Sequence, residues 1–181
     1  MKKILFIIGS FRKDSFNKQL AKLAEKLIGE SAEVSYLDYS VIPFINQDIE
    51  YPAPDSITKI RKQCLDTDAI WIFTPEYNHS YPGALKNLID WLSRPLTLGA
   101  PRSENALNGK LFTISSAAGG SGGSFVREKL IELLSFTGAK EATSIYTGIV
   151  LDREAFQTGV LKANTEALEQ QVKELLNVIS I

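Results

Sequence analysis

The chain has 181 residues, of which 44% are apolar and 23% are charged, and its formal net charge is -1. This length and composition fit a single globular domain, residues 1–181, that is long enough to bury a sizeable core. A net charge near zero gives no electrostatic reason to expect nucleic acid or an anionic membrane as a partner, and no apolar run approaches the ~20 residues of a membrane-spanning helix.

Five apolar runs along the chain predict strands. The first of them is too short to be the core of a secretory signal, and no cleavage-like site follows it. Three of the runs are rich enough in Ile, Leu, Phe and Val to be buried on both faces, as in a parallel sheet. The predicted strands are Lys3–Ile8, Glu33–Leu37, Ala69–Phe73, Lys110–Ser115 and Thr143–Tyr146.

Between and after these strands, apolar residues recur at three- and four-residue spacing, which predicts helices. The apolar positions that define the helices run from Phe16 to Leu27, Ile57 to Cys64, Leu85 to Leu92, Val126 to Leu134 and Leu161 to Ile179. Such an alternation with short connections predicts a doubly wound α/β fold, with a five-stranded parallel sheet in the order 2-1-3-4-5.

The only cysteine, Cys64, lies on the apolar face of the second predicted helix, so we expect a small core residue there. A lone cysteine excludes an internal disulfide and is consistent with a reducing cytoplasm. Two connections, 40–53 and 96–108, are longer than the fold requires. Each is a candidate lid or subunit contact, and a plain surface excursion fits equally well.

The order 2-1-3-4-5 places the crevice for a ligand between the first and third strands, at their carboxyl ends. After the first strand, Ser10, Ser15 and Asn17 offer neutral donors, and Arg12 offers a charged one. The amino end of the first helix adds free N–H groups and the positive end of its dipole. The dinucleotide fingerprint and the nucleotide P-loop are both absent, so the loop predicts a mononucleotide phosphate. The alternatives are that Ser15 simply caps the helix and that Arg12 is solvated.

After the third strand, Pro75, Glu76, Tyr77 and Asn78 form a loop that can present backbone groups to the edge of a heteroaromatic ring. We expect Glu76 to pair with a cation or to hold this loop, rather than to act as an acid. The only histidine, His79, has no second histidine or cysteine nearby, which argues against a metal site and places it at the rim.

After the fourth strand comes Ser116-Ala117-Ala118, followed by Gly119, Gly120, Gly122 and Gly123. Glycines at this density indicate that the backbone approaches a ligand closely, and a flexible entry into the next helix is the alternative. This loop lies beside the third strand, on the side predicted for a ring.

These segments resemble a known family. The stretches G-S-F-R-K-D-S-F-N at 9–17 and T-P-E-Y-N-H-S-Y-P-G-A-L-K-N-L-I-D-W-L-S-R at 74–94, with the glycines at 119–123, are similar to the NADPH-dependent FMN reductases. The flavodoxin-like members of that family include quinone, chromate and azo-dye reductases. The resemblance implies that an FMN phosphate is held by Ser10, Arg12, Ser15, Phe16 and Asn17, and its ring by Pro75, Glu76, Tyr77, Asn78, Ser116, Ala117 and Gly120.

The resemblance also implies an activity. A nicotinamide, from NADPH or NADH, would give a hydride to FMN, which would then pass electrons to a quinone, azo compound, metal oxyanion or flavin in a ping-pong reaction. No single catalytic side chain is expected. A homodimer or homotetramer is implied, with Trp91 and Arg94 near a neighbouring chain. A flavodoxin-type electron carrier and a ligand-binding module on the same fold are the alternatives.

Overall fold

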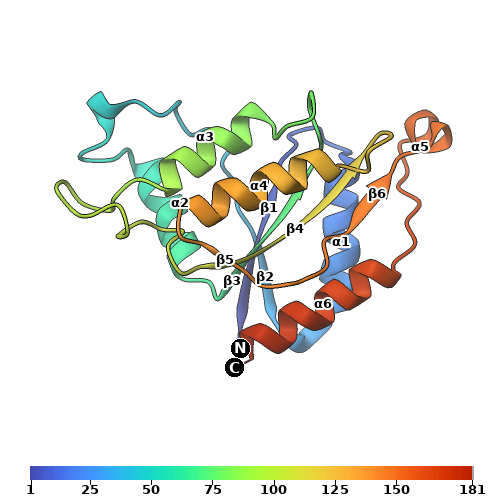
Figure 1. Cartoon of the computed structure of the whole chain (residues 1–181). Coiled ribbons are helices and arrows are strands. Elements are labelled where there is room, and N and C mark those ends of the chain that lie inside the picture. Colours follow the sequence, from blue (N-terminus) through green and yellow to red (C-terminus); the bar gives the residue numbers. More distant parts are fainter. Residues whose placement is uncertain (181) are drawn as a thin grey trace.

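The computed structural model describes residues 1–180 and shows one parallel sheet with helices on both faces (Figure 1). The strands that form the middle of the sheet follow the predicted runs closely. The strands are β1 Lys3–Ile8, β2 Glu33–Tyr36, β3 Ala69–Thr74, β4 Leu111–Ala118, β5 Lys140–Glu141 and β6 Gly148–Val150. The helices are α1 Phe16–Ile28, α2 Asp55–Leu65, α3 Gly83–Leu92, α4 Ser124–Phe136, α5 Arg153–Thr158 and α6 Glu166–Ile179, with short 3-10 turns at Gly29–Ser31 and Gln47–Ile49.

The sheet has the order β2-β1-β3-β4-β5, which confirms the predicted doubly wound topology. All neighbouring strands are parallel, and β1 lies between β2 and β3 with Ile4 beside Ala69 and Ile8 beside Phe73. All six residues of β3 are buried because helices cover both of its faces. This double burial explains why its sequence is a continuous apolar run without alternation.

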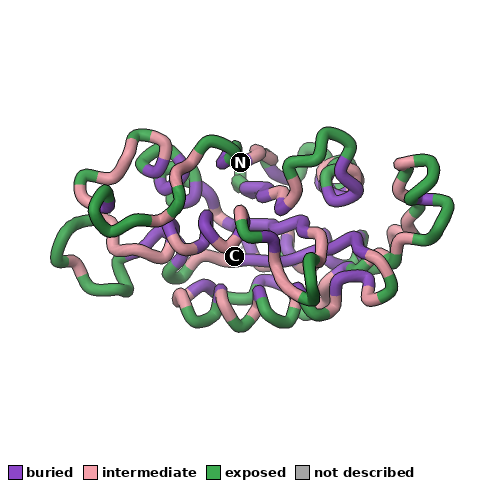
Figure 2. Tube along the Cα trace, turned by 90° about the horizontal axis from the view of Figure 1, so that it is seen from above, coloured by how far each residue is buried: buried purple, intermediate pink, exposed green. Residues whose placement is uncertain are grey.

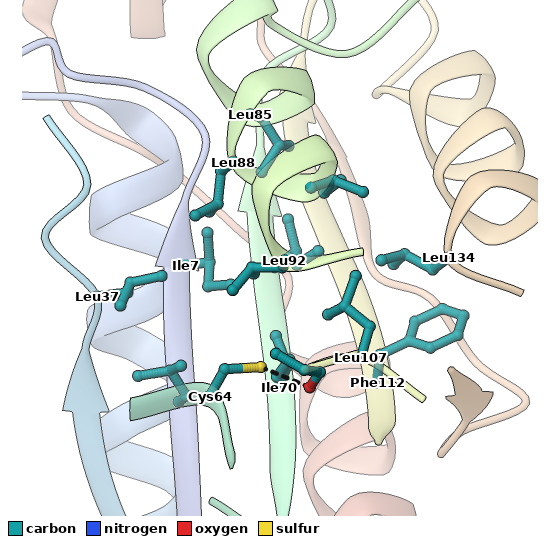
Figure 3. Packing of buried hydrophobic residues seen from close by; sticks show 14 of the residues in the cluster. Ile7, Leu37, Cys64, Ile70, Leu85, Leu88, Leu92, Leu107, Phe112 and Leu134 are labelled. Carbon is teal, nitrogen blue, oxygen red and sulfur yellow. Dashed lines mark hydrogen bonds between the residues drawn. The ribbon is translucent and has the colours of Figure 1, made fainter. Parts of the chain in front are cut away.

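The core is divided by the sheet into two clusters. Residues of α2, α3 and α4 pack on one face, and residues of α1 and α6 pack on the other (Figure 1). Figure 2 shows the buried residues along the middle of the molecule and the exposed ones around it. Cys64 is fully buried in the first cluster, where its thiol donates to the carbonyl of Ala106 at 3.2 Å (Figure 3). Burial raises the pKa of this thiol to about 12, so the prediction of a core cysteine is confirmed.

The prediction of a strand at Thr143–Tyr146 was wrong. The fifth position of the sheet is split into β5 and β6, which both pair with β4 on either side of that segment. The side chain of Gln171 in α6 occupies the gap: its amide accepts from the N–H of Thr147 and donates to the carbonyl of Ile114, both at 2.9 Å. A buried side chain thus makes the hydrogen bonds that a continuous strand would have made.

Two element boundaries also differ from the prediction. The last helix begins at Glu166 and not near Leu161, because the short helix α5 and the loop after it occupy the residues before it. Strand β4 extends through Ser116 and Ala117, which were predicted to start the loop. Within residues 1–180, no helix is both long enough and apolar enough to cross a membrane.

The connection 40–53 is fastened to α3. Asn87 accepts from the N–H of Ile45 at 2.8 Å and donates to the carbonyl of Pro43 at 3.0 Å. The indole N–H of Trp91 donates to the same carbonyl at 2.8 Å. Trp91 is fully buried, so the expectation that it meets a neighbouring chain was wrong. Its apolar ring and its one donor are both used inside the chain.

Arg94, one turn further along the chain, forms a two-point ion pair with Glu50 at 2.6 and 2.9 Å. Glu50 is buried, and this pairing lowers the pKa of its carboxyl group. The guanidinium of Arg94 is therefore already used within the chain. Asn87, Trp91 and Arg94 thus hold the connection 40–53 in place.

Candidate functional site

Three polar loops meet at the carboxyl ends of β1, β3 and β4, at the upper end of the sheet in Figure 1. We name them the first loop (residues 9–15), the second loop (75–82) and the third loop (119–123). The first two come together at Gly9, whose N–H donates to the carbonyl of Phe73 at 2.7 Å. A Cβ at position 9 would lie 2.6 Å from Oγ1 of Thr74, so only glycine lets these two strand ends lie so close.

The first loop leads into the amino end of α1. Ser15 is the N-cap, and its Oγ accepts from the N–H of Asn17 at 3.2 Å. Within residues 1–180, the N–H groups of Ser10, Phe11 and Phe16 have no protein acceptor. Together with the helix dipole, these free donors give the first loop the character of an anion site.

Arg12 is exposed on the first loop, with its guanidinium 4.8 Å from the centre of the Phe16 ring. The loop is supported from below by Tyr39, whose hydroxyl donates to the carbonyl of Ile8 at 2.8 Å and whose ring packs on Phe11. Burial raises the pKa of Tyr39, so the phenol stays protonated and keeps this hydrogen bond. The cation of Arg12 is therefore carried on a fixed backbone and is free to move toward an anion.

Asn17, in the first turn of α1, joins the first loop to the end of β4. Its Oδ1 accepts from the N–H of Ala117 at 2.8 Å, and its Nδ2 donates to the carbonyl of the same residue at 3.0 Å. The residue is buried. The side chain that was expected to donate to a phosphate is thus used, in this structure, to fix α1 against β4.

The second loop is a tight hairpin and not an irregular segment. Tyr77 and Ser80 exchange both of their backbone hydrogen bonds, at 2.9 and 3.0 Å. The two residues at its tip, Asn78 and His79, have positive φ angles of 53° and 56°. This is the pattern of a type I′ turn, and it fixes the position of the His79 ring, which stacks on Phe125 with 4.2 Å between the ring centres.

Glu76 links the second loop to the third. Its carboxylate accepts from the hydroxyl of Ser121 at 2.7 Å and from the N–H of Val126 at 3.1 Å. The second contact supplies the hydrogen bond that an N-cap side chain would make, since the N-cap of α4 is Gly123. Glu76 was expected to pair with a cation or to hold its own loop, and the structure shows that it holds the third loop instead.

In the third loop, no contact within the protein explains why residues 119 and 120 are glycine. A Cβ at Gly119 or Gly120 would meet nothing within 4 Å, and neither residue has a positive φ angle. By contrast, Gly123 has a φ of 80° and lies against Ser116. Within the described part of the chain, the N–H groups of Gly119, Gly120 and Ser121 have no protein acceptor.

The second and third loops enclose a hollow of about 640 Å³. Its walls are backbone and small side chains, with the stacked ring pair on one side. The lining residues are Glu76, Asn78, His79, Ala118, Gly119, Gly120, Ser121 and Phe125. A volume of this size suits a small organic ligand. The free N–H groups beside it can bind the electron-rich edge of a flat ring, and the glycines allow that ring to approach the backbone.

Seven of the twelve predicted site residues fall into two groups. Glu76, Asn78 and Gly120 line the hollow, and Ser10, Arg12, Ser15 and Phe16 surround the amino end of α1. Ser116 and Ala117 are buried in β4, and the Ser116 hydroxyl donates to the carbonyl of Gly122 at 2.7 Å.

Ala118, Gly119 and Ser121 also line the hollow and lie in the loop that was predicted to approach a ligand, whereas the sequence reasoning missed Phe125. An exposed aromatic residue directly after a glycine-rich loop was the available signal for Phe125. Within residues 1–180, no group of three or more His, Cys, Asp and Glu side chains is placed to hold a metal ion.

A comparison with protein families finds that residues 2–152 match the model of the NADPH-dependent FMN reductases. A 2-hydroxy-1,4-benzoquinone reductase from a Burkholderia species is 42% identical over 93 residues, which are 51% of this chain and 51% of that protein. The chain thus matches about half the length of that relative. A quinone reductase from Escherichia coli strain K12 is 32% identical over 163 residues, covering 88% of this chain and 78% of that protein.

A comparison with solved structures finds the flavoenzyme NAD(P)H:(acceptor) oxidoreductase FerB from Paracoccus denitrificans. It is 30% identical, with a TM-score of 0.82, over 99% of this chain and 98% of that one.

Proposed function

The chain belongs to the NADPH-dependent FMN reductase family, and from this premise we propose that it binds FMN where the three loops meet and uses it to oxidise a nicotinamide nucleotide. The observation that supports this best is the pair Gly119 and Gly120. Their missing side chains open onto the hollow, and nothing in the protein requires glycine there. A flat ring packed against their backbone would explain why both positions are glycine.

The first loop suits the phosphate of FMN. The free N–H groups of Ser10 and Phe16 and the α1 dipole favour a dianion. The oxygen of Ser15 already accepts from Asn17, so its O–H remains to donate to a phosphate oxygen. Arg12 adds a charged donor. This set of donors fits a terminal phosphate monoester without a bound metal ion.

The second and third loops suit the ring. Pro75, Glu76, Tyr77 and Asn78 would border it on one side, and the backbone from Ser116 and Ala117 to Gly120 on the other. When bound, FMN supplies hydride acceptance from the nicotinamide and electron donation to a second substrate at the same surface, which gives a ping-pong sequence. The chain binds and orients the ring and offers N–H donors to its polar edge. On this account, no side chain acts as an acid or a nucleophile.

We propose a small quinone as the acceptor class, because relatives carry the name quinone reductase. The donor is NADPH or NADH. We also propose a homodimer or homotetramer, whose contacts do not involve the buried Trp91.

The test is an absorbance spectrum of the purified protein, before and after addition of FMN, followed by anaerobic titration with NADPH and then with benzoquinone. We expect a flavin spectrum that NADPH bleaches and the quinone restores. A yellow protein that NADPH does not bleach would indicate an electron carrier instead. A protein that takes up no FMN would refute the proposal.

The Arg12→Ala variant tests the phosphate end. Loss of one charged hydrogen bond should weaken FMN binding by about 1.5–3 kcal/mol, measured by fluorescence titration of the apoprotein. Lys13→Ala is the matched control, because it removes a neighbouring exposed cation and should change the affinity by less than about 1 kcal/mol. An unchanged affinity in Arg12→Ala would show that the phosphate lies elsewhere.

A further inference from the structure

Arg127, in the first turn of α4, places its guanidinium behind the third loop. Nη1 donates to the carbonyl of Gly122 at 2.7 Å and also contacts the hydroxyl of Ser116. Space for this group is provided by Gly148 in β6, because a Cβ at that position would collide with the guanidinium. The guanidinium of Arg127 therefore lies against Gly122, Gly148 and the end of β4 at Ser116.

This cation has no carboxylate partner within ion-pair distance in residues 1–180. It is also half-buried, and this partial burial lowers its pKa. A partly buried charge without an ion-pair partner carries a free-energy cost that the carbonyl and hydroxyl dipoles around it offset in part. Such a group beside a candidate site is a sign of a functional role.

Glu76 holds the same loop at the neighbouring residue. Its carboxylate binds the hydroxyl of Ser121, and Arg127 binds the carbonyl of the next residue, Gly122. The attraction of Glu76, and that of Glu128 on the same helix as Arg127, opposes the lowering of the pKa of Arg127, although neither carboxylate forms an ion pair with it. An anion and a cation are thus fixed at consecutive residues of the loop that borders the hollow.

We propose that Arg127 and Glu76 act as an opposed pair of positioning residues that sets the reduction potential of the bound flavin. This inference rests on the proposed binding of FMN. The oxidised ring is neutral, whereas the reduced ring acquires negative charge, so a fixed cation stabilises the reduced form and a fixed anion destabilises it. The charges need no motion during the reaction, because the loop already holds them.

The experiment measures the midpoint potential of bound FMN against a reference dye, together with the Kd of oxidised FMN, in the wild type and in single variants. Arg127→Met should weaken binding of the reduced form about tenfold relative to the oxidised form, which corresponds to a potential about 30 mV lower for a two-electron couple. Glu76→Gln, which keeps the shape of the side chain, should raise the potential. Arg127→Lys keeps the charge and should stay close to the wild type.

Lys129→Met is the matched control, since it removes an exposed cation from the same helix, two residues away. Its potential should remain at the wild-type value. A purely structural role of Arg127 would change the Kd of both redox forms equally and leave the potential unmoved, and that result would overturn the inference.

Should Arg127→Met bind no FMN, a Glu76→Gln potential at or below that of the wild type would overturn the inference in the same way. Absence of FMN binding by the wild type would instead refute the proposed function.

Discussion

Replacement of Gln171 by methionine should destabilise the fold more than most single substitutions do, because this amide completes the sheet where the fifth strand is interrupted. Gln171 is fully buried and makes four hydrogen bonds. Its Oε1 accepts from Ser115 Oγ and from Thr147 N, each at 2.9 Å. Its Nε2 donates to Thr113 Oγ1 at 2.6 Å and to the Ile114 carbonyl at 2.9 Å. Methionine has a similar length and none of these groups.

The magnitude follows from which partners are left unpaired. Thr113 keeps its contact with Thr143, and the Ser115 oxygen still accepts from the Trp71 indole. The N–H of Thr147, the carbonyl of Ile114 and the hydroxyl hydrogen of Ser115 lose their partners. Each stranded buried group costs about 1–3 kcal/mol, and relaxation recovers part of that cost. We therefore expect a loss of about 3–5 kcal/mol, a large share of the total stability of a domain.

The assay is urea denaturation followed by circular dichroism, with the free energy of unfolding obtained by linear extrapolation. Gln170→Met is the control: Gln170 is the neighbouring exposed residue, and its variant should stay within about 0.5 kcal/mol of the wild type. A Gln171→Met variant that loses less than about 1 kcal/mol at an unchanged m-value would show that the gap in the sheet does not depend on this side chain.

Two further substitutions test other contacts. Gly9→Ala should lower the free energy of unfolding by about 1–3 kcal/mol, because the new Cβ would lie 2.6 Å from Thr74 Oγ1. Urea denaturation measures this loss, and the double variant Gly9→Ala with Thr74→Ala should recover part of it. Arg94→Met should cost about 2–3 kcal/mol at pH 7, since it leaves the buried Glu50 carboxylate unpaired. Arg94 lowers the pKa of Glu50 in the folded state, so the ion pair stabilises the fold above the unfolded pKa and this contribution is lost as the pH falls through the folded value. Unfolding free energies of the wild type and Arg94→Met should therefore converge in acid, and a difference that stays constant with pH would contradict this account.

The centre of the fold could be predicted because it depends on one strong signal. Strands β1 and β3 are buried on both faces, so their residues are apolar without a break, and the observed bounds match the predicted ones to within one residue. The prediction failed at Thr143–Tyr146, where β-branched and aromatic residues suggest a strand. The N–H of Ser144 donates to Glu174 and the N–H of Thr147, next to the segment, donates to Gln171, both more than 20 residues later in the chain. No local pattern reports such partners.

The meeting of the three loops at one edge could be predicted for the same reason as the fold, since strand order decides which loops are neighbours. The roles of single polar residues could not. Asn17 and Glu76 were recognised as polar residues at a ligand edge, but their side chains bind the backbone of Ala117 and the third loop. A sequence shows that a side chain can donate or accept, and it does not show which partner is close enough.

These contacts share a physical cause. Three loops that meet around a hollow must be fixed, yet the groups that fix them cannot fill the space that a ligand needs. Asn17 and Arg127 bind a neighbouring strand end or loop without lining the hollow, and Glu76 binds the third loop from the wall of the hollow. The backbone N–H groups of Gly119 and Gly120 then remain free beside the hollow. Around the hollow, side chains such as Asn17, Glu76 and Arg127 fix the loops, and glycines with free N–H groups border the space for a flat ring.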